Sequence, residues 1–173
     1  MYKIDLETLQ TRFFTFQPYG FTTTCLHRSQ RSGVLYVGST KGLFTKLDKT
    51  DTLTELRLSS LVDQSEIRYI HENSEGLWLC TTQGLFLYDE GRNTCLDYSD
   101  ITQNTAVNHL YETPEGAFWL GTFGQGLLHW SPGALSAMPY NYQDGLTDEQ
   151  ILAVYPDEYG LLWMPTNNGL IRF

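Results

Sequence analysis

Basic residues are scarce in this chain. Eleven Lys and Arg stand against twenty Asp and Glu among 173 residues, which gives a formal net charge of -9 at pH 7. Nucleic acids and anionic membrane surfaces are bound through clustered positive charge, so we exclude both as partners of this segment. The acidic and aromatic-rich composition favours a neutral or cationic ligand.

Cysteine is also rare, and the three cysteines form no recognisable site. Cys25, Cys80 and Cys95 stand in no Cys-x-x-Cys pair and at no regular spacing from histidine, so we predict no metal site and no cofactor. An odd number of cysteines provides no disulfide framework, which leaves the redox compartment open. Cys80 takes a position that glycine holds in related segments, and we expect a small buried thiol there.

Long apolar runs and export signals are missing too. No apolar run reaches the ~18 residues of a membrane-spanning helix, and the N-terminus lacks a basic stretch followed by an apolar one. No stretch with helical periodicity is long enough to predict a helix of note, and short alternating stretches separated by turn signals predict strands instead. Hydrophobic residues still make up 41% of the chain, which excludes disorder. We therefore expect an all-β protein without membrane contact in this segment.

What the sequence does contain is one motif written four times. Clear copies read Leu-Trp-Leu-Cys-Thr at 77–81 and Phe-Trp-Leu-Gly-Thr at 118–122. The aromatic position is filled by Tyr36, Trp78, Trp119 and Trp163, which are 42, 41 and 44 residues apart. A fixed period of this length indicates a stacked array of one repeated unit.

Each repeat holds four short strand patterns, which is typical of a β-propeller blade. We expect the first strand at the channel and the fourth at the rim. The sequence predicts a propeller fragment of about four four-stranded blades. It comprises two strands of a preceding blade at 1–16, complete blades at 17–58, 59–98 and 99–142, and three strands of a last blade at 143–173. Because open ends leave blade faces unpaired, we expect self-association, either as a homodimer or by completion of a larger propeller.

The repeat resembles the two-component regulator propeller repeat of bacterial hybrid histidine kinases. Segments 117–122, 142–147 and 162–173 carry the resemblance best, whereas Tyr36 in place of Trp, Cys80 and Pro165 in place of Gly, and an added residue at 124–125 depart from it. In that family the propellers are periplasmic sensor regions. The resemblance implies a non-catalytic segment in which an oligosaccharide or other small molecule biases propeller pairing, and a kinase outside this chain receives the signal.

Residues that recur at one position of the repeat are expected to be scaffold. The aromatic position should pack blade on blade, and Ser39, Thr81, Thr122 and Thr166 should hydrogen-bond to the backbone of the following turn. Function is expected where the copies differ. We predict ligand-binding side chains on the first strands, facing the channel, and in nearby loops: Arg68, His71, Asn108, His109, Tyr111, Gln83, Phe123, Gln125 and Asn167.

Two other functions stay open. A sialidase-like or other glycoside hydrolase would need an Asp-box turn, but its Asp position holds Ser74, Pro114 and Glu158. Glu72 and Glu112 repeat at the end of the first strand and suit paired carboxylates, although their repetition favours a role in a turn. The second is a protein-interaction platform of the WD-repeat kind, but the Gly-His and Trp-Asp signatures of that repeat are absent from the sequence.

Overall fold

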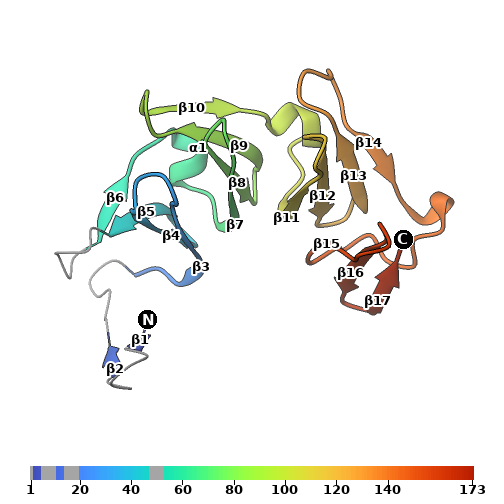
Figure 1. The fold of residues 1–173 in the computed structure, drawn as a ribbon, viewed down its shortest axis with the longest axis horizontal. Helices are drawn as coiled ribbons and strands as arrows, with labels where there is room; N and C mark the ends of the chain where they lie inside the picture. The colour runs from blue at the N-terminus through green and yellow to red at the C-terminus, as the bar shows by residue number, and fades with distance from the viewer. Residues whose placement is uncertain (1, 5–10, 14–19, 47–52) are drawn as a thin grey trace.

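The computed structural model describes residues 2–4, 11–13, 20–46 and 53–173, and it shows a series of antiparallel sheets that follow an arc (Figure 1). A short two-stranded sheet is formed by β1 (Tyr2–Ile4) and β2 (Thr11–Phe13). The first four-stranded sheet, blade 1, contains β3 (Thr23–Arg28), β4 (Leu35–Ser39), β5 (Gly42–Lys46) and β6 (Thr54–Leu56).

Three further sheets follow along the arc. Blade 2 contains β7 (Ile67–Glu72), β8 (Leu77–Thr81), β9 (Gly84–Asp89) and β10 (Thr94–Asp97), preceded by the short helix α1 (Ser60–Asp63). Blade 3 contains β11 (Val107–Glu112), β12 (Phe118–Thr122), β13 (Leu127–Trp130) and β14 (Met138–Tyr140), preceded by η1 (Ser99–Thr102). Blade 4 contains β15 (Tyr155–Pro156), β16 (Leu162–Thr166) and β17 (Gly169–Arg172), preceded by η2 (Tyr142–Asp144).

Within every blade, strands that are neighbours in the sequence pair with each other. The first strand of a blade, which we call the inner strand, faces the inside of the arc, and β10 and β14 lie at its outer rim (Figure 1). The predicted class, an all-β propeller fragment with one blade per repeat, is confirmed. Residues 5–10, 14–19 and 47–52 lie outside the described ranges, so the blade boundaries predicted near residue 16 stay predictions.

Consecutive blades pack face to face through large apolar side chains. Trp78 of blade 2 is fully buried against Phe118 and Trp130 of blade 3, with ring centroids 4.9 and 5.8 Å apart. Alternate residues of a strand point to opposite faces of its sheet, so each blade has one apolar set for each neighbour. The aromatic position is buried in Tyr36 and Trp78 but only partly buried in Trp119 and Trp163.

The small residue after this aromatic position makes room for the next blade. A Cβ atom on Gly121 would lie 2.9 Å from Ile151 Cγ2 and 3.2 Å from the Ile151 carbonyl oxygen. Between blades 2 and 3 the equivalent residues are Cys80 and Val107, which share one core cluster. Valine is one methylene smaller than isoleucine, so a buried thiol fits there, as predicted for Cys80. All three cysteines are free.

The repeated hydroxyl side chains do the scaffold work expected of them. Thr81 Oγ1 donates to the Gly84 carbonyl oxygen at 3.0 Å and accepts from the Gln83 N–H. The same pair of bonds occurs in the other three blades at Ser39, Thr122 and Thr166. These bonds close each loop between the second and third strands, which fixes the backbone that carries the loop side chains.

The inner strand of blade 4 has two residues, whereas the inner strands of blades 1 to 3 have six each. The Leu152 N–H donates to the Pro165 carbonyl oxygen at 2.9 Å. Pro165 has no N–H to return a bond, so the ladder is interrupted and regular pairing resumes only at Tyr155. Leu26 of β3 is 52% exposed, because it lies on the face of blade 1 directed away from blade 2.

Candidate ligand-binding site

The inner strands carry a β-bulge close to their first residue. The register shifts between Thr23 and Cys25, between Ile67 and Tyr69, and between Val107 and His109. A bulge leaves one residue unpaired and redirects its side chain. The bulged residues are Thr24, Arg68 and Asn108, and all three lie at the loop end of the blades, where connections 57–66, 98–106, 123–126 and 141–150 meet.

Two of the bulged side chains serve as scaffold, and the third departs from that pattern. Thr24 Oγ1 donates to the Ile67 carbonyl oxygen, and Asn108 Nδ2 donates to the Ile151 carbonyl oxygen at 2.7 Å. Each bond joins one blade to the next. Arg68 instead donates from its guanidinium to Asn108 Oδ1 and lies over the ring of Phe123, with 5.6 Å from Cζ to the ring centroid.

The loop that carries Phe123 is fixed on blade 4. The N–H groups of Gly124 and Gly126 both donate to the Glu149 carbonyl oxygen, at 2.9 and 3.0 Å, and Phe123 forms an isolated bridge with Gln150. The Phe123 side chain is nevertheless 49% exposed. Its position therefore comes from backbone bonding and not from burial of its ring.

These contacts define a contiguous polar and aromatic group at the loop end. We call it the Arg68 cluster: Arg68, Asn108, Phe123, Gln150 and Asn167. Asn167 joins through a hydrogen bond from its Nδ2 to Gln150 Oε1. The five residues come from blades 2, 3 and 4, and the sequence predicted four of them. Gln150 was missed, although its place directly before Ile151, equivalent to that of Glu66 before Ile67, is a signal that the repeat alignment offers.

The remaining predicted site residues lie elsewhere. Gln83 and Gln125 are in loops of the same end, where the described bonds are those of their backbone N–H groups. His71 lies at the opposite end of its strand, and Tyr111 packs against the core between blades 3 and 4. The predicted position at the channel was wrong for His109, which is buried between Tyr69 and Val154 because blade packing encloses that stretch of the strand.

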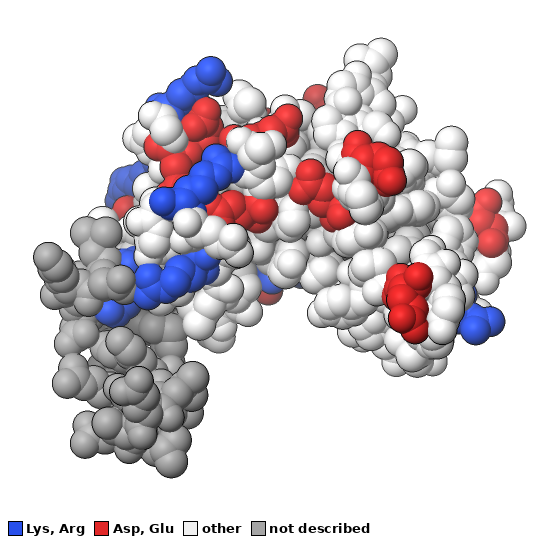
Figure 2. All heavy atoms as spheres, viewed as in Figure 1, with Lys and Arg blue, Asp and Glu red and all other residues white. Residues whose placement is uncertain are grey.

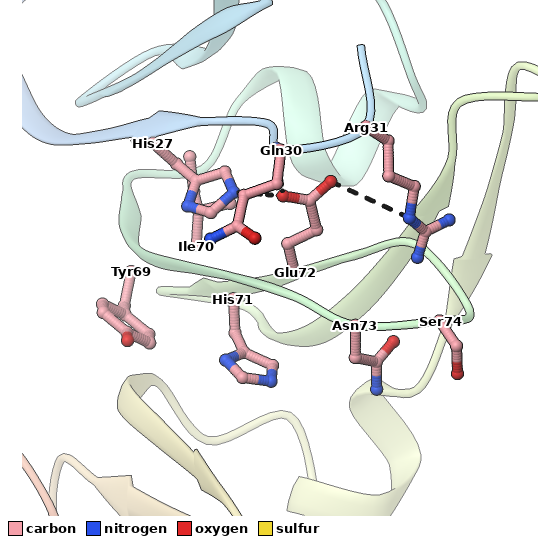
Figure 3. A pocket seen from close by; sticks show the side chains of 9 residues that line it. All are labelled: His27, Gln30, Arg31, Tyr69, Ile70, His71, Glu72, Asn73 and Ser74. Atoms are coloured by element: carbon pink, nitrogen blue, oxygen red, sulfur yellow. Dashed lines mark hydrogen bonds and ion pairs between the residues drawn. The ribbon is translucent and has the colours of Figure 1, made fainter. Parts of the chain in front are cut away.

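A depression of about 370 Å³ lies at the other end of the inner strands, between blades 1 and 2 (Figure 3). This is the turn end, where connections 29–34, 73–76 and 113–117 meet. Its lining combines two imidazoles, a guanidinium, two amides and one carboxylate with an aromatic ring: His27, Gln30, Arg31, Tyr69, Ile70, His71, Glu72, Asn73 and Ser74.

Glu72 is fully engaged in holding the turn of the neighbouring blade. Its carboxylate accepts from the Gln30 N–H and the Ser29 hydroxyl, each at 2.8 Å, and lies 3.1 Å from His27 Nε2. Burial acts to raise the pKa of Glu72, but these hydrogen bonds outweigh it and lower the pKa to about 2. Such a carboxyl stays ionised near neutral pH, so it lacks the proton that a general acid must donate.

Glu112 has the equivalent role at the next pair of blades. Its carboxylate lies 2.7 Å from His71 Nε2 and accepts two bonds from the Asn73 amide at 3.1 Å. Both glutamates bond to a turn, and each side chain crosses to the preceding blade to do so. Within the described ranges, no three His, Cys, Asp or Glu side chains are grouped to hold a metal ion.

Charge is distributed unevenly along the array. No Lys or Arg occurs between Asn93 and Ile171, a stretch that holds nine Asp and Glu. Most of the basic side chains visible in Figure 2 gather over the blades at the left, whereas acidic side chains are spread across the view. Blade 3 itself has no Lys or Arg, and the cationic side chain that contacts its Asn108 and Phe123 is Arg68 of blade 2.

Comparison with known proteins found similarity of fold alone. Neither protein-family models nor curated proteins match the sequence. The structure is similar to the extracellular domain of the hybrid two-component system BT4673 from B. thetaiotaomicron, with a TM-score of 0.81 and 18% identity over 99% of this chain and 24% of that one. The WD40 β-propeller domain of Doa1 matches with a TM-score of 0.66 and 15% identity over 87% of this chain and 50% of that one.

The fold is that of a β-propeller segment. It spans about a quarter of the length of the two-component domain that it matches. A streptogramin B lyase structure shares the fold as well, with a TM-score of 0.71 and 15% identity over 99% of this chain and 60% of that one. The predicted resemblance to sensor propellers is confirmed at the level of fold. None of the helices in the described ranges has the length and apolar character that a membrane crossing requires.

Proposed function

We propose that this propeller segment is a non-catalytic, ligand-binding portion of the periplasmic sensor region of a bacterial two-component protein. The observation that carries the proposal is the match of 99% of the chain to an extracellular domain of a hybrid two-component system. The chemistry of the site supports it. The histidines and glutamates of the turn end are engaged in bonds between blades, whereas the Arg68 cluster is partly exposed to solvent and suited to binding.

The signal is relayed by association of propellers to a histidine kinase and its phosphorelay outside this chain. The outer face of blade 4 supports this relay. Leu170 is 62% exposed there, beside Trp163 and Pro165. Trp163 is the repeat equivalent of Trp78, which blade 3 buries completely. A face built like an inter-blade interface is suited to a second copy or to a further blade of a larger propeller.

Calorimetric titration of the purified chain tests the binding role. We expect at least one compound from a panel of neutral oligosaccharides and small organic ions to bind without being converted. The same panel should include aryl glycosides and sialosides, and their hydrolysis would establish the enzyme function instead. Capture of a protein partner with no small-molecule binding would favour the interaction platform.

A further inference from the structure

We propose that the Arg68 cluster binds a small monocarboxylate that carries a flat apolar group. The guanidinium would pair with the carboxylate, and the exposed ring of Phe123 would contact the flat group. The proposal rests on the sensor function proposed above and adds to it the chemical class of the ligand. It starts from the departure of Arg68 from the repeat pattern.

A side chain as long as arginine is not needed at this bulge to join one blade to the next. Thr24 and Asn108 join their blades to the next one with a short hydroxyl or amide side chain. Arg68 makes no such bond to a backbone carbonyl of blade 3 and contacts two side chains instead. A long charged side chain costs more conformational entropy when it is held in place than a short one does. A ligand that uses the charge accounts for its presence.

The guanidinium has donors to spare. One terminal nitrogen donates to Asn108 Oδ1, and Nε lies 3.8 Å from Glu66 Oε1, which is ion-pair distance and too long for a hydrogen bond. Arginine carries five N–H donors in a planar fork that matches a carboxylate. The side chain is 25% exposed, so the contacts with Asn108 and Phe123 orient the fork while some of it stays accessible.

The environment selects one negative charge over several. Glu66 offsets some of the arginine charge, and the 79 residues from 93 to 171, which include blade 3 and most of blade 4, contain no Lys or Arg. A phosphate or polyanion would be repelled by the protein, whose net charge is -9, and would find only one cationic side chain, Arg68, in this cluster. A single carboxylate needs one bidentate partner. Paired with an arginine that is already oriented, it gains more than an exposed ion pair between flexible side chains.

Phe123 supplies the apolar half of the site. Phe123 is 49% exposed although the loop that carries it is held by the Gly124 and Gly126 bonds to blade 4. Aromatic rings favour offset or edge contacts with other flat groups. The amides of Gln150 and Asn167 bond to each other beside it, which leaves polar groups at the rim for a carboxylate that also carries hydroxyls.

Benzoate is the simplest probe of this chemistry, and benzamide is its neutral match in shape. Isothermal titration of the full chain at low salt should show benzoate binding and at least about tenfold weaker benzamide binding, since a charged hydrogen-bonded pair is worth more than a neutral one. Arg68→Gln should weaken benzoate about tenfold or more, Arg68→Lys less, and Phe123→Ala severalfold. Arg92→Gln, an exposed arginine at the turn end, should leave benzoate binding unchanged.

Each result decides between the two proposals. Equal benzoate affinity in wild type and in folded Arg68→Gln, or equal affinity for benzoate and benzamide, overturns this inference. If only neutral or cationic compounds bind, and Arg68→Gln does not change their affinity, the carboxylate site is overturned and the sensor role stands. Failure of every compound to bind removes both. Thermal unfolding of each variant establishes that it is folded before titration.

Discussion

Glu72 shows how a single side chain can belong to one blade and stabilise another. It leaves the end of β7 and accepts three bonds from residues 27–30 of blade 1. Its side chain is 9% exposed, so the bonds form largely out of water, where hydrogen bonds to a charged group are strong. Stability and pH should therefore be coupled at this residue.

Glu72→Gln should lower the free energy of unfolding by up to about 3 kcal/mol at pH 7, because one pKa unit corresponds to about 1.4 kcal/mol. The folded pKa of about 2 lies below the ordinary value of 4.5. The stabilisation is therefore present above pH 4.5 and is lost as the pH falls towards 2. Urea unfolding of both proteins at pH 7 and at pH 3 measures the difference, which should shrink at the lower pH.

Glu75→Gln is the matched control, since Glu75 lies exposed in the adjacent turn. Its unfolding free energy should stay within about 0.5 kcal/mol of wild type. A loss for Glu72→Gln that equals the loss for Glu75→Gln would contradict the bond between blades as the source of stability.

His109 should titrate far below an ordinary histidine. Burial, and then the charge of His71, lower its pKa from 6.5 to about 4. The folded state thus holds the neutral ring against Tyr69, at 4.0 Å between centroids, and its contribution to stability falls as the pH drops from 6.5 to 4. Following the imidazole resonances by NMR, with His109→Gln to assign them, measures the midpoint. A value near 6.5 would show that the ring is solvated.

Among the elements, packing between blades rests on matched pairs of small and large residues. Gly38 faces Ile67, and Gly121 faces Ile151. Neither glycine has a positive φ, so space alone demands the missing side chain. At the interface of blades 2 and 3 the pair is Cys80 and Val107, so the larger residue in the glycine position is matched by a smaller residue on the facing strand.

Gly121→Ala should destabilise the fold by about 1–3 kcal/mol because the new methyl group overpacks the interface. Ile151→Val removes the Cδ1 methyl group and gives Cγ2 room to shift away from residue 121, and we expect the double variant to recover some of the loss. A double-mutant cycle in urea measures the coupling between the two sites. Gly91→Ala, in an exposed turn without positive φ, controls for the change in chain entropy. Additive losses would contradict the direct contact.

The repeat made most of the elements predictable, and the exceptions have local causes. The motif at 77–81 coincides with β8, and the unit predicted at 59–98 contains the four strands β7 to β10. The ladder of blade 4 is interrupted because the neighbouring strand needs an N–H group that Pro165 lacks. The hydrophobic pattern of one strand does not show which N–H groups its neighbour needs. The crossing of Glu72 and Glu112 to the preceding blade depends on how far one blade is rotated from the next.

The candidate site was predictable as a set of residue types but not as a geometry. Departure from the repeat singled out Arg68, Asn108, Phe123 and Asn167, which the structure brings together. The same criterion selected His109 and Tyr111, because side-chain chemistry alone does not distinguish a channel-facing position from one enclosed by the next blade. The bulge decides between them, and a bulge is invisible in a pattern of alternating residues.

At the scale of the whole molecule, the outer face of blade 4 should govern association. Leu170→Glu places a charge on this face and should shift a concentration-dependent equilibrium towards monomer, because apolar contact across it would bury an unpaired carboxylate. Light scattering at several concentrations measures the shift. Leu135→Glu, at a fully exposed loop position, should leave the molar mass unchanged. A wild-type monomer at all concentrations would contradict self-association.

The carboxylate bonds between blades are not present at every interface. His27 with Glu72 joins blades 1 and 2, and His71 with Glu112 joins blades 2 and 3. The equivalent residues at the third interface are Tyr111 and Pro156, which form no such pair, and the inner strand there has only two regular residues. Stretched between its ends, the array should therefore separate first between blades 3 and 4, at a lower force than the other two joints withstand.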